Sequence, residues 1–146
     1  MDNTLIFTCE ISVRWGDMDA VGHVNNAVYF TYMQQARVAW LESVGLGEVV
    51  RRPRQGPVIV SAACEYKQPI VHPATLRVKM YAGAPRRSSF ETRYEILDLK
   101  VPELLYALGK AQVVWVDHEQ GRSMPIPPRI RAFLPPSPVS SSEDRL

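Results

Sequence analysis

Polar and apolar positions alternate along several short stretches of this chain, and such alternation is the pattern of strands in an antiparallel sheet. It predicts strands over 5–15, 58–66, 76–81 and 90–96. In the second of these strands the apolar and small positions fall on one face: Val58, Val60, Ala62, Cys64 and Tyr66.

One long helix is predicted over 27–44, because apolar side chains recur there every three or four residues. Gly45 follows and suits the stop position of a helix. Residues 47–57 hold three arginines, two glycines and two prolines, so they are expected to form a mobile loop. A short helical turn is predicted within 129–134.

A nearly continuous apolar run over 104–116 predicts a central strand or one covered on both faces. The breaks before it, at 68–73, 83–87 and 98–102, are short, which favours antiparallel pairing over repeated parallel crossovers. The order of strand, long helix and about four more strands predicts an α+β fold in which a sheet covers the helix.

The length, composition and net charge indicate which class of protein this is. With 146 residues, 46% hydrophobic and 22% charged, the chain is expected to form one domain over 1–134. Residues 135–146 are rich in proline and serine and are expected to be a disordered tail. A net charge of +2 is too small to predict nucleic-acid binding.

The sequence also bears on the location of the protein and on the state of its two cysteines. No apolar run reaches the roughly 18 residues of a membrane span, and the first residues lack a signal peptide. We therefore expect a cytoplasmic protein that does not bind membranes. Cys9 and Cys64 match no metal-ligand spacing and are expected to be buried thiols.

The chemically richest stretch lies directly before the predicted helix. Residues 16–26 hold two carboxylates, Asp17 and Asp19, an imidazole, His23, and two side-chain amides. The first N–H groups of a helix lack partners within the helix and attract anions. A reactive polar turn that leads into a helix therefore suits catalysis, although an aspartate there could equally cap the helix or order the turn.

The same stretch belongs to a longer motif: Arg14-Trp15-Gly16-Asp17-Met18-Asp19, Gly22-His23-Val24-Asn25-Asn26, then Tyr29, Ala36 and Arg37. In this order the motif resembles that of the hotdog-fold thioesterases. The nearest subgroup contains the 4-hydroxybenzoyl-CoA thioesterases and the short-chain acyl-CoA thioesterases. The resemblance covers about residues 5–134.

The resemblance implies a hotdog fold, in which a curved antiparallel sheet of about five strands wraps a long central helix. It also implies a homodimer with active sites at the subunit interface, often paired into a homotetramer, and no metal or organic cofactor. The implied function is that of an acyl-CoA thioesterase, which hydrolyses an acyl-CoA thioester to a free acid and CoA. CoA would enter only as part of the substrate.

Three residues are candidates for catalysis on this resemblance. Asp19 occupies the position of the catalytic carboxylate, acting as nucleophile or as general base toward water, whereas Asp17 is expected to order the turn. The backbone amide of Asn26 falls where the family holds the thioester oxygen. His23 matches the histidine of plant acyl-carrier-protein thioesterases and could bind the carbonyl or orient water, but Val21 replaces the asparagine of their pattern.

Further residues are candidates for substrate binding. Gly22 permits a positive φ and the close approach of a ligand. Asn25 is a second candidate for substrate binding, and one of Asn25 and Asn26 is also expected to cap the helix. Tyr29 could line the acyl pocket or belong to the core, and Ser61 could reach the site from a partner subunit or face solvent.

The turn at 86–89 is basic and rich in hydroxyl groups, and in the family this turn contacts the CoA phosphates, which suits the forked donors of arginine. A solvated basic surface is the alternative, and the arginines at 51–54 are a rival anion site. Arg37, on the apolar face of the helix, could reach solvent or pair with an acid across the dimer. The candidate binding residues of the turn are Arg86, Arg87, Ser88 and Ser89.

Two other functions stay open on the sequence. The protein could act on acyl groups carried by an acyl-carrier protein, or it could bind acyl thioesters without catalysis. The acyl chain length, a preference for aromatic acyl groups, and the choice between dimer and tetramer are likewise open.

Overall fold

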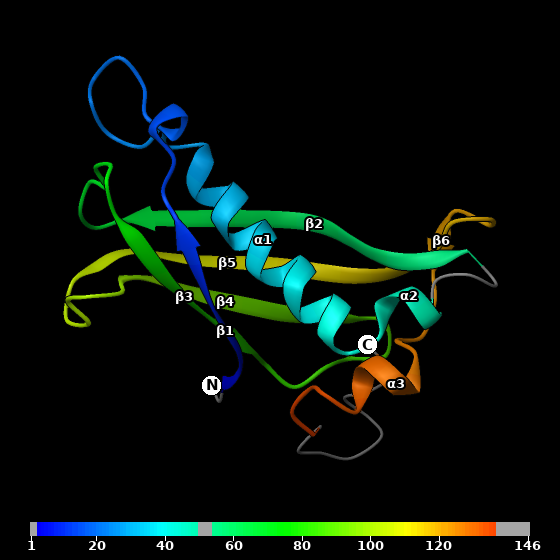
Figure 1. Cartoon of the computed structure of the whole chain (residues 1–146). Helices are drawn as coiled ribbons and strands as arrows, with labels where there is room; N and C mark the ends of the chain where they lie inside the picture. Colours follow the sequence, from blue (N-terminus) through cyan, green and yellow to red (C-terminus); the bar gives the residue numbers. More distant parts are fainter. Residues whose placement is uncertain (1–2, 50–53, 137–146) are drawn as a thin grey trace.

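The computed structural model describes residues 3–49 and 54–136, and over this part it shows one antiparallel sheet with a single long helix against it (Figure 1). Strand β1 (Thr4–Ser12) leads through the 3-10 turn η1 (Trp15–Asp17) into helix α1 (Val28–Ser43) and the short helix α2 (Leu46–Val49). Four strands follow: β2 (Gln55–Tyr66), β3 (Thr75–Ala82), β4 (Ser89–Asp98) and β5 (Leu105–Asp117). The last elements are the two-residue strand β6 (Arg122–Ser123) and the helix α3 (Pro128–Arg131).

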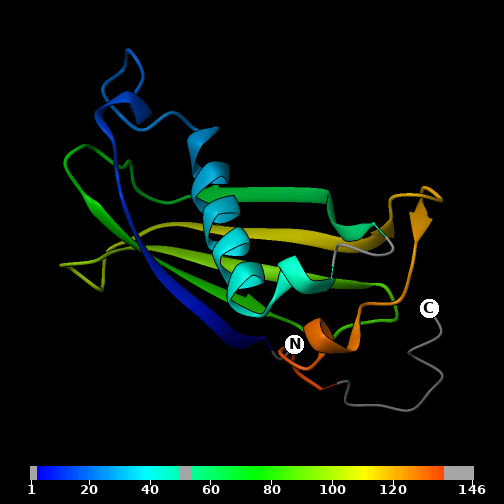
Figure 2. The ribbon, with the colours of Figure 1, turned by 45° about the vertical axis from the view of Figure 1, so that its right-hand side comes forward.

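The sheet has the order β1-β3-β4-β5-β2, and each neighbouring pair is antiparallel. Strand β6 pairs with the end of β5. Figure 2 shows the strands curving past α1, as the hotdog fold requires. The α+β prediction is therefore confirmed, with β6 as a sixth strand too short to give an alternating pattern. Within the described residues, no helix is long and apolar enough to cross a membrane.

The core lies between α1 and the face of the sheet that the helix covers, where α1 contacts β1 and β3. Strand β3 buries Leu76, Val78 and Met80 on that face and turns the polar residues between them outward. The helix contributes Tyr32 and Trp40 among its buried residues. Each large apolar side chain buried in this way stabilises the fold by roughly 1.5–3 kcal/mol, so the core fixes the register of α1 on the sheet.

Several predicted elements are confirmed. Helix α1 occupies nearly the whole of 27–44, and Gly45 ends it with a φ of +92°. The apolar run over 104–116 forms β5, which lies inside the sheet between β4 and β2. The expected turn within 129–134 is α3, at Pro128–Arg131. The two cysteines are free thiols but are only half-buried.

Two predicted boundaries were wrong. The first strand ends at Ser12, because the chain turns into η1 and leaves Trp15 76% exposed. The predicted loop over 47–57 is shorter, because α2 reaches Val49 and β2 begins at Gln55. Gln55 is buried there and its Oε1 accepts a hydrogen bond of 2.7 Å from Trp115 Nε1. Arg51 and Arg52 of the rival anion site lie outside the described residues, as does most of the expected tail, from 137 to 146.

The predicted single face of β2 was also wrong. The pairing of β2 with β5 shifts between Ile59 and Ser61, where one extra residue bulges out of the strand. A bulge reverses the phase of the residues that follow it. Pro57 and Ile59 therefore line the same groove as Ala62, while Val58 and Val60 stay 36% and 58% exposed.

Candidate active site

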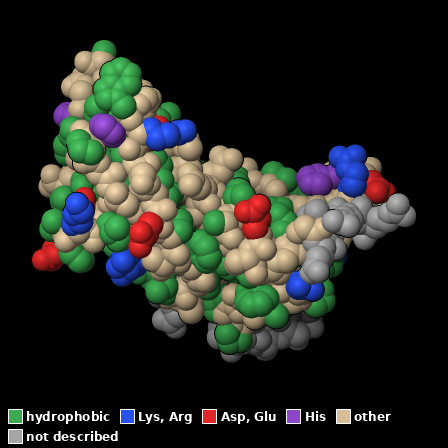
Figure 3. Space-filling model, in the orientation of Figure 1, with side chains coloured by type: hydrophobic (Ala, Val, Ile, Leu, Met, Phe, Trp, Pro, Cys, Tyr) green, Lys and Arg blue, Asp and Glu red, His purple; other side chains and the backbone are tan. Residues whose placement is uncertain are grey.

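The segment between β1 and α1 projects beyond the sheet (Figures 1 and 3). Asp17 anchors it. Asp17 as a residue is only 4% exposed. Its Oδ2 accepts hydrogen bonds from the Arg14 N–H (3.0 Å) and the Tyr32 hydroxyl (2.9 Å), and its Oδ1 lies 3.1 Å from Arg14 Nη2. Burial alone would raise the pKa of Asp17, but these hydrogen bonds and the Arg14 charge outweigh it and lower that pKa. Asp17 thus orders the turn, as predicted.

The turn at 19–23 is a tight hairpin. The Asp19 N–H donates to the His23 carbonyl (2.9 Å), and the Gly22 N–H donates to the Asp19 carbonyl (3.0 Å). Gly22 has the predicted positive φ, +90°. The Asp19 side chain is exposed, and its Oδ1 accepts a hydrogen bond of 2.9 Å from the Val21 N–H. One carboxylate oxygen of Asp19 therefore holds the turn, and the other has no partner among the described residues.

The start of α1 is capped differently from the prediction. The N-cap is Ala27, without a side-chain cap, so neither asparagine is the N-cap. Asn25 lies two residues before this N-cap, where its Oδ1 accepts a hydrogen bond from the Ala27 N–H (2.9 Å) and its carbonyl accepts one from the Val28 N–H (2.9 Å). The first turn of the helix is thus closed by the backbone and side chain of Asn25.

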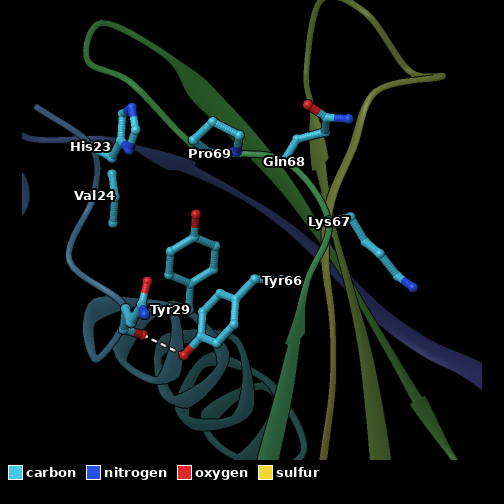
Figure 4. Close-up of a pocket in the computed structure, with 8 residues that line it drawn as sticks. His23, Val24, Tyr29, Tyr66, Lys67, Gln68 and Pro69 are labelled. Atoms are coloured by element: carbon cyan, nitrogen blue, oxygen red, sulfur yellow. Dashed lines mark hydrogen bonds between the residues drawn. The ribbon is translucent and has the colours of Figure 1, made fainter.

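Asn26 is fixed by its neighbours. Its carbonyl accepts a 2.9 Å hydrogen bond from the Tyr66 hydroxyl at the end of β2, drawn in Figure 4. Its own N–H has no acceptor within 3–49 and 54–136. Because the Asn25 carbonyl is turned into the helix, and N–H and C=O point in opposite directions across a trans peptide, the Asn26 N–H points away from the helix.

A cavity of about 200 Å³ lies beside this helix start. In Figure 4, His23 and Val24 stand on one side of it, and the segment that follows β2 stands on the other, with Tyr29 between them. Tyr29 is buried; its ring meets that of Tyr66 edge to face at 4.8 Å, and burial raises its pKa. The lining residues are His23, Val24, Asn26, Tyr29, Tyr66, Lys67, Gln68 and Pro69.

The cavity thus brings together three predicted site residues, His23, Asn26 and Tyr29. Asp19 does not line it, although Asp19 bonds to the backbone of His23, which does. Tyr66 also lines the cavity, and the sequence did not single it out as a candidate site residue. Its position in the Glu65-Tyr66 pair, shortly before Pro69-Ile70, was the available signal.

A second hollow lies farther along α1. It is a groove of about 400 Å³ between α1 and strands β2, β4 and β5. Arg37 stands in it half-buried, and its Nη1 donates to the Tyr94 hydroxyl (2.9 Å), which shares a 2.8 Å hydrogen bond with Thr92 Oγ1. The lining residues are Phe30, Met33, Gln34, Arg37, Val38, Leu41, Pro57, Ile59, Ala62, Tyr94, Lys110 and Ala111.

The basic turn at 86–89 lies at the other end of α1. Arg131 of α3 donates to the carbonyls of Arg86 and Arg87, the latter at 3.2 Å. Arg129 of α3 in turn donates to the Val44 carbonyl, 3.3 Å away, just past the end of α1. A helix of 16 residues is about 24 Å long, so one chain does not bring this turn to the Asn26 cavity.

Ser61 is also apart from that cavity. It is exposed on β2 and lines a separate hollow of about 160 Å³ with Glu91 and Lys110. Among the residues that the structure describes, no group of three or more histidine, cysteine, aspartate or glutamate side chains could hold a metal ion.

Comparison with known proteins identifies the class. Residues 13–134 match the thioesterase-like superfamily, so the chain belongs to that family. The resemblance found in the motif at 14–37 is therefore confirmed, and with it the predicted class of enzyme, a thioester hydrolase.

Particular relatives agree with the class. A candidate thioesterase of Pseudomonas aeruginosa is 44% identical, with a TM-score of 0.81 over 88% of this chain and 98% of that one. A candidate acyl-CoA thioesterase of Xanthomonas campestris is 38% identical, with a TM-score of 0.70 over 82% of this chain and all (100%) of that one. A chloroplastic acyl-acyl carrier protein thioesterase of Arabidopsis thaliana is 32% identical over 127 residues, which cover 84% of this chain and 64% of that protein.

Proposed function

We propose that this protein hydrolyses acyl-CoA thioesters to a free acid and CoA at the cavity beside the start of α1. The observation that carries the proposal is the N–H of Asn26, which has no acceptor among the described residues. Its peptide group is held by the hydrogen bond from the Val28 N–H to the Asn25 carbonyl, and the next peptide group by the Tyr66 hydroxyl. A fixed donor with no acceptor is what an oxyanion site requires.

The thioester oxygen would accept a hydrogen bond from the Asn26 N–H and gain negative charge as the carbonyl is attacked. The N-terminal end of α1 favours that charge through its dipole. A single preorganised donor of this kind contributes roughly 3 kcal/mol to lowering the barrier. No metal or organic cofactor takes part in this proposal, and CoA enters only as substrate.

Asp19 is the proposed nucleophile or general base. Its carboxylate is exposed and has one oxygen free of partners among the described residues, and its turn is continuous with His23 at the cavity. A carboxylate can attack a thioester carbonyl, so that the C–S bond breaks, the CoA thiolate leaves and an anhydride forms, or it can deprotonate the attacking water. His23 would bind the carbonyl or orient that water.

The test is the release of free thiol from a panel of acyl-CoA substrates by wild type, Asp19→Ala and Asp19→Asn. The asparagine variant is the matched control for structure, because its side-chain oxygen can still accept from the Val21 N–H while the negative charge is gone. We expect both variants to lose nearly all activity. A wild-type rate in Asp19→Asn would refute the role of the carboxylate.

The source of the oxygen in the product acid distinguishes general-base catalysis from an anhydride that water opens at the Asp19 carbonyl. In a single turnover in ¹⁸O-water, general-base catalysis puts the label into the product acid. An anhydride opened at the Asp19 carbonyl instead delivers an unlabelled oxygen from the enzyme to the product and leaves the label on Asp19.

The acyl group is proposed to lie in the groove between α1 and β2. The groove begins at Phe30, one helical turn beyond Asn26, so an acyl chain bound through its carbonyl at Asn26 can continue into it. Most of its lining side chains are apolar, which suits a hydrocarbon or aromatic group.

A homodimer is proposed to complete the site. Strand β2 ends the sheet, so one of its edges is unpaired within the described chain, and Val58 and Val60 are exposed on it. An exposed strand edge of this kind is a template for pairing with another chain, here a second copy. The partner's turn at 86–89 could then supply the anion-binding arginines that this chain keeps far from Asn26. Light scattering tests this assembly, and an active monomer would refute the shared site.

A second candidate function is hydrolysis of acyl groups carried by an acyl-carrier protein. It is favoured by the 32% identity to the Arabidopsis enzyme and by His23 in the turn. Rates on matched CoA and carrier-protein thioesters discriminate the two. Tight binding of both without turnover would instead support a binding module.

A further inference from the structure

Gly109 stands in the middle of β5, paired with Cys64 of β2 on one side and Tyr94 of β4 on the other. Glycine weakens the interior of a strand and often marks a place where another group approaches closely. Its backbone does not need glycine, since the positive φ angles in the described chain belong to Gly22, Gly45 and Gly121. The reason for glycine at 109 is therefore space above the strand.

Met33 of α1 fills that space. A Cβ atom placed on Gly109 would overlap Met33 Sδ and lie 3.1 Å from its Cε. Met33 is 2% exposed, and it is also one of the residues that line the groove between α1 and β2. Its flexible thioether thus lies between the sheet and the groove.

We propose that Gly109 sets the length of the acyl group that the groove accepts, because the lack of a side chain at 109 lets Met33 pack directly against the sheet. This inference rests on the proposed function, which places the acyl chain in the groove. A methyl group at 109 would overlap Met33 Sδ, and the open space that Met33 borders is the groove. The thioether must therefore move into the path of the acyl chain.

The position of Met33 predicts where the obstruction falls. Met33 is seven residues beyond Asn26 along the helix, about 10 Å at 1.5 Å per residue. Short acyl groups bound through their carbonyl at Asn26 end before that point, whereas longer ones must pass it. The substitution should therefore shorten the chain-length profile instead of lowering activity uniformly.

The experiment measures kcat/KM over a series of straight-chain acyl-CoA substrates of increasing length for wild type, Gly109→Ala, Met33→Ala and the double variant. We expect Gly109→Ala to keep activity on the shortest substrates and to lose about tenfold or more on those that pass Met33, since one methylene in a pocket changes kcat/KM by about 10–200-fold. Met33→Ala should extend the profile, and the double variant should regain the long substrates.

Gly47→Ala is the matched control, because a Cβ there meets nothing within 4 Å. It should leave the profile unchanged. An equal loss on every substrate in Gly109→Ala would overturn the proposal, as would failure of Met33→Ala to restore the long substrates in the double variant. Should Gly109→Ala fail to fold, an unchanged profile in Met33→Ala alone overturns it.

Binding of non-hydrolysable acyl-CoA thioethers separates this inference from the proposed function. A wild type that binds the thioethers but hydrolyses no thioester refutes the proposed function, and the length profile of binding in the variants still decides the role of Gly109. A wild type that binds no member of the series refutes both.

Discussion

Replacing Tyr32 with phenylalanine should destabilise the fold in a pH-dependent way. The Tyr32 hydroxyl donates to Asp17 Oδ2 at 2.9 Å, and both side chains are almost fully buried, at 2% and 4% exposure. A hydrogen bond to a charged group contributes about 1.5–3 kcal/mol. Because Arg14 still pairs with the carboxylate, we expect a loss of about 2 kcal/mol in the free energy of unfolding at neutral pH.

The pH dependence follows from the direction of the pKa shift. The contacts of Asp17 hold its pKa in the folded protein below the ordinary value. Its ionised form therefore stabilises the fold above the ordinary pKa of about 4, and that stabilisation is lost as the pH falls through the lower, folded-state pKa. Phenylalanine removes one of the contacts, so the difference between variant and wild type should be largest at neutral pH and should shrink in acid.

The measurement is urea unfolding of wild type and Tyr32→Phe at fixed protein concentration across the acid range. Tyr29→Phe is the matched control, because the Tyr29 hydroxyl accepts from the uncharged Ile70 N–H (3.3 Å). Its cost, about 1 kcal/mol, should not change over the same pH range. A Tyr32→Phe variant whose deficit is equally large in acid, or absent at neutral pH, would show that the Asp17 carboxylate is not stabilised as described.

Three further predictions concern the site and the ends of the sheet. Tyr66→Phe removes the 2.9 Å hydrogen bond to the Asn26 carbonyl. In steady-state kinetics it should lower kcat for acyl-CoA hydrolysis by about tenfold with little change in KM, because a misplaced oxyanion donor stabilises the transition state less. Arg131 holds the turn at 86–89, which is proposed to bind the CoA phosphates, through the carbonyls of Arg86 and Arg87. In steady-state kinetics, Arg131→Ala should therefore raise KM for acyl-CoA by up to about tenfold. It should leave KM unchanged for an acyl-pantetheine, which lacks the nucleotide phosphates. Gln55→Ala should cost about 1–3 kcal/mol of stability in a denaturant titration, because it leaves the fully buried Trp115 Nε1 without an acceptor.

Features that depend on neighbours in sequence were predictable. The helical spacing of apolar residues located α1, and the glycine after it marked its end, because both follow from the local geometry of a helix. The turn function of Asp17 was predictable for the same reason, since one of its partners, Arg14, is only three residues away. The motif that contains Asp19 and His23 identified the family.

Features that depend on distant residues were not predictable. The bulge at Val60 is defined only by the pairing of β2 with β5, and no local pattern reveals it. Asn25 is not the N-cap that was expected, and η1 also binds this segment, since the Asn25 N–H donates to the Asp17 carbonyl. Tyr66 reaches Asn26 across 40 positions of sequence.

The sequence by itself thus determined the long helix, the alternating strands, the family and the polar turn before the helix, since each depends on residues that lie close together along the chain. Only the tertiary structure decided which groups share a space. It brought Asn26, His23 and Tyr29 to one cavity, packed Met33 against Gly109, and placed the basic turn at 86–89 at the far end of α1. The physical reason is that strand register and helix packing are fixed by the burial of the whole core, which no short stretch of sequence contains.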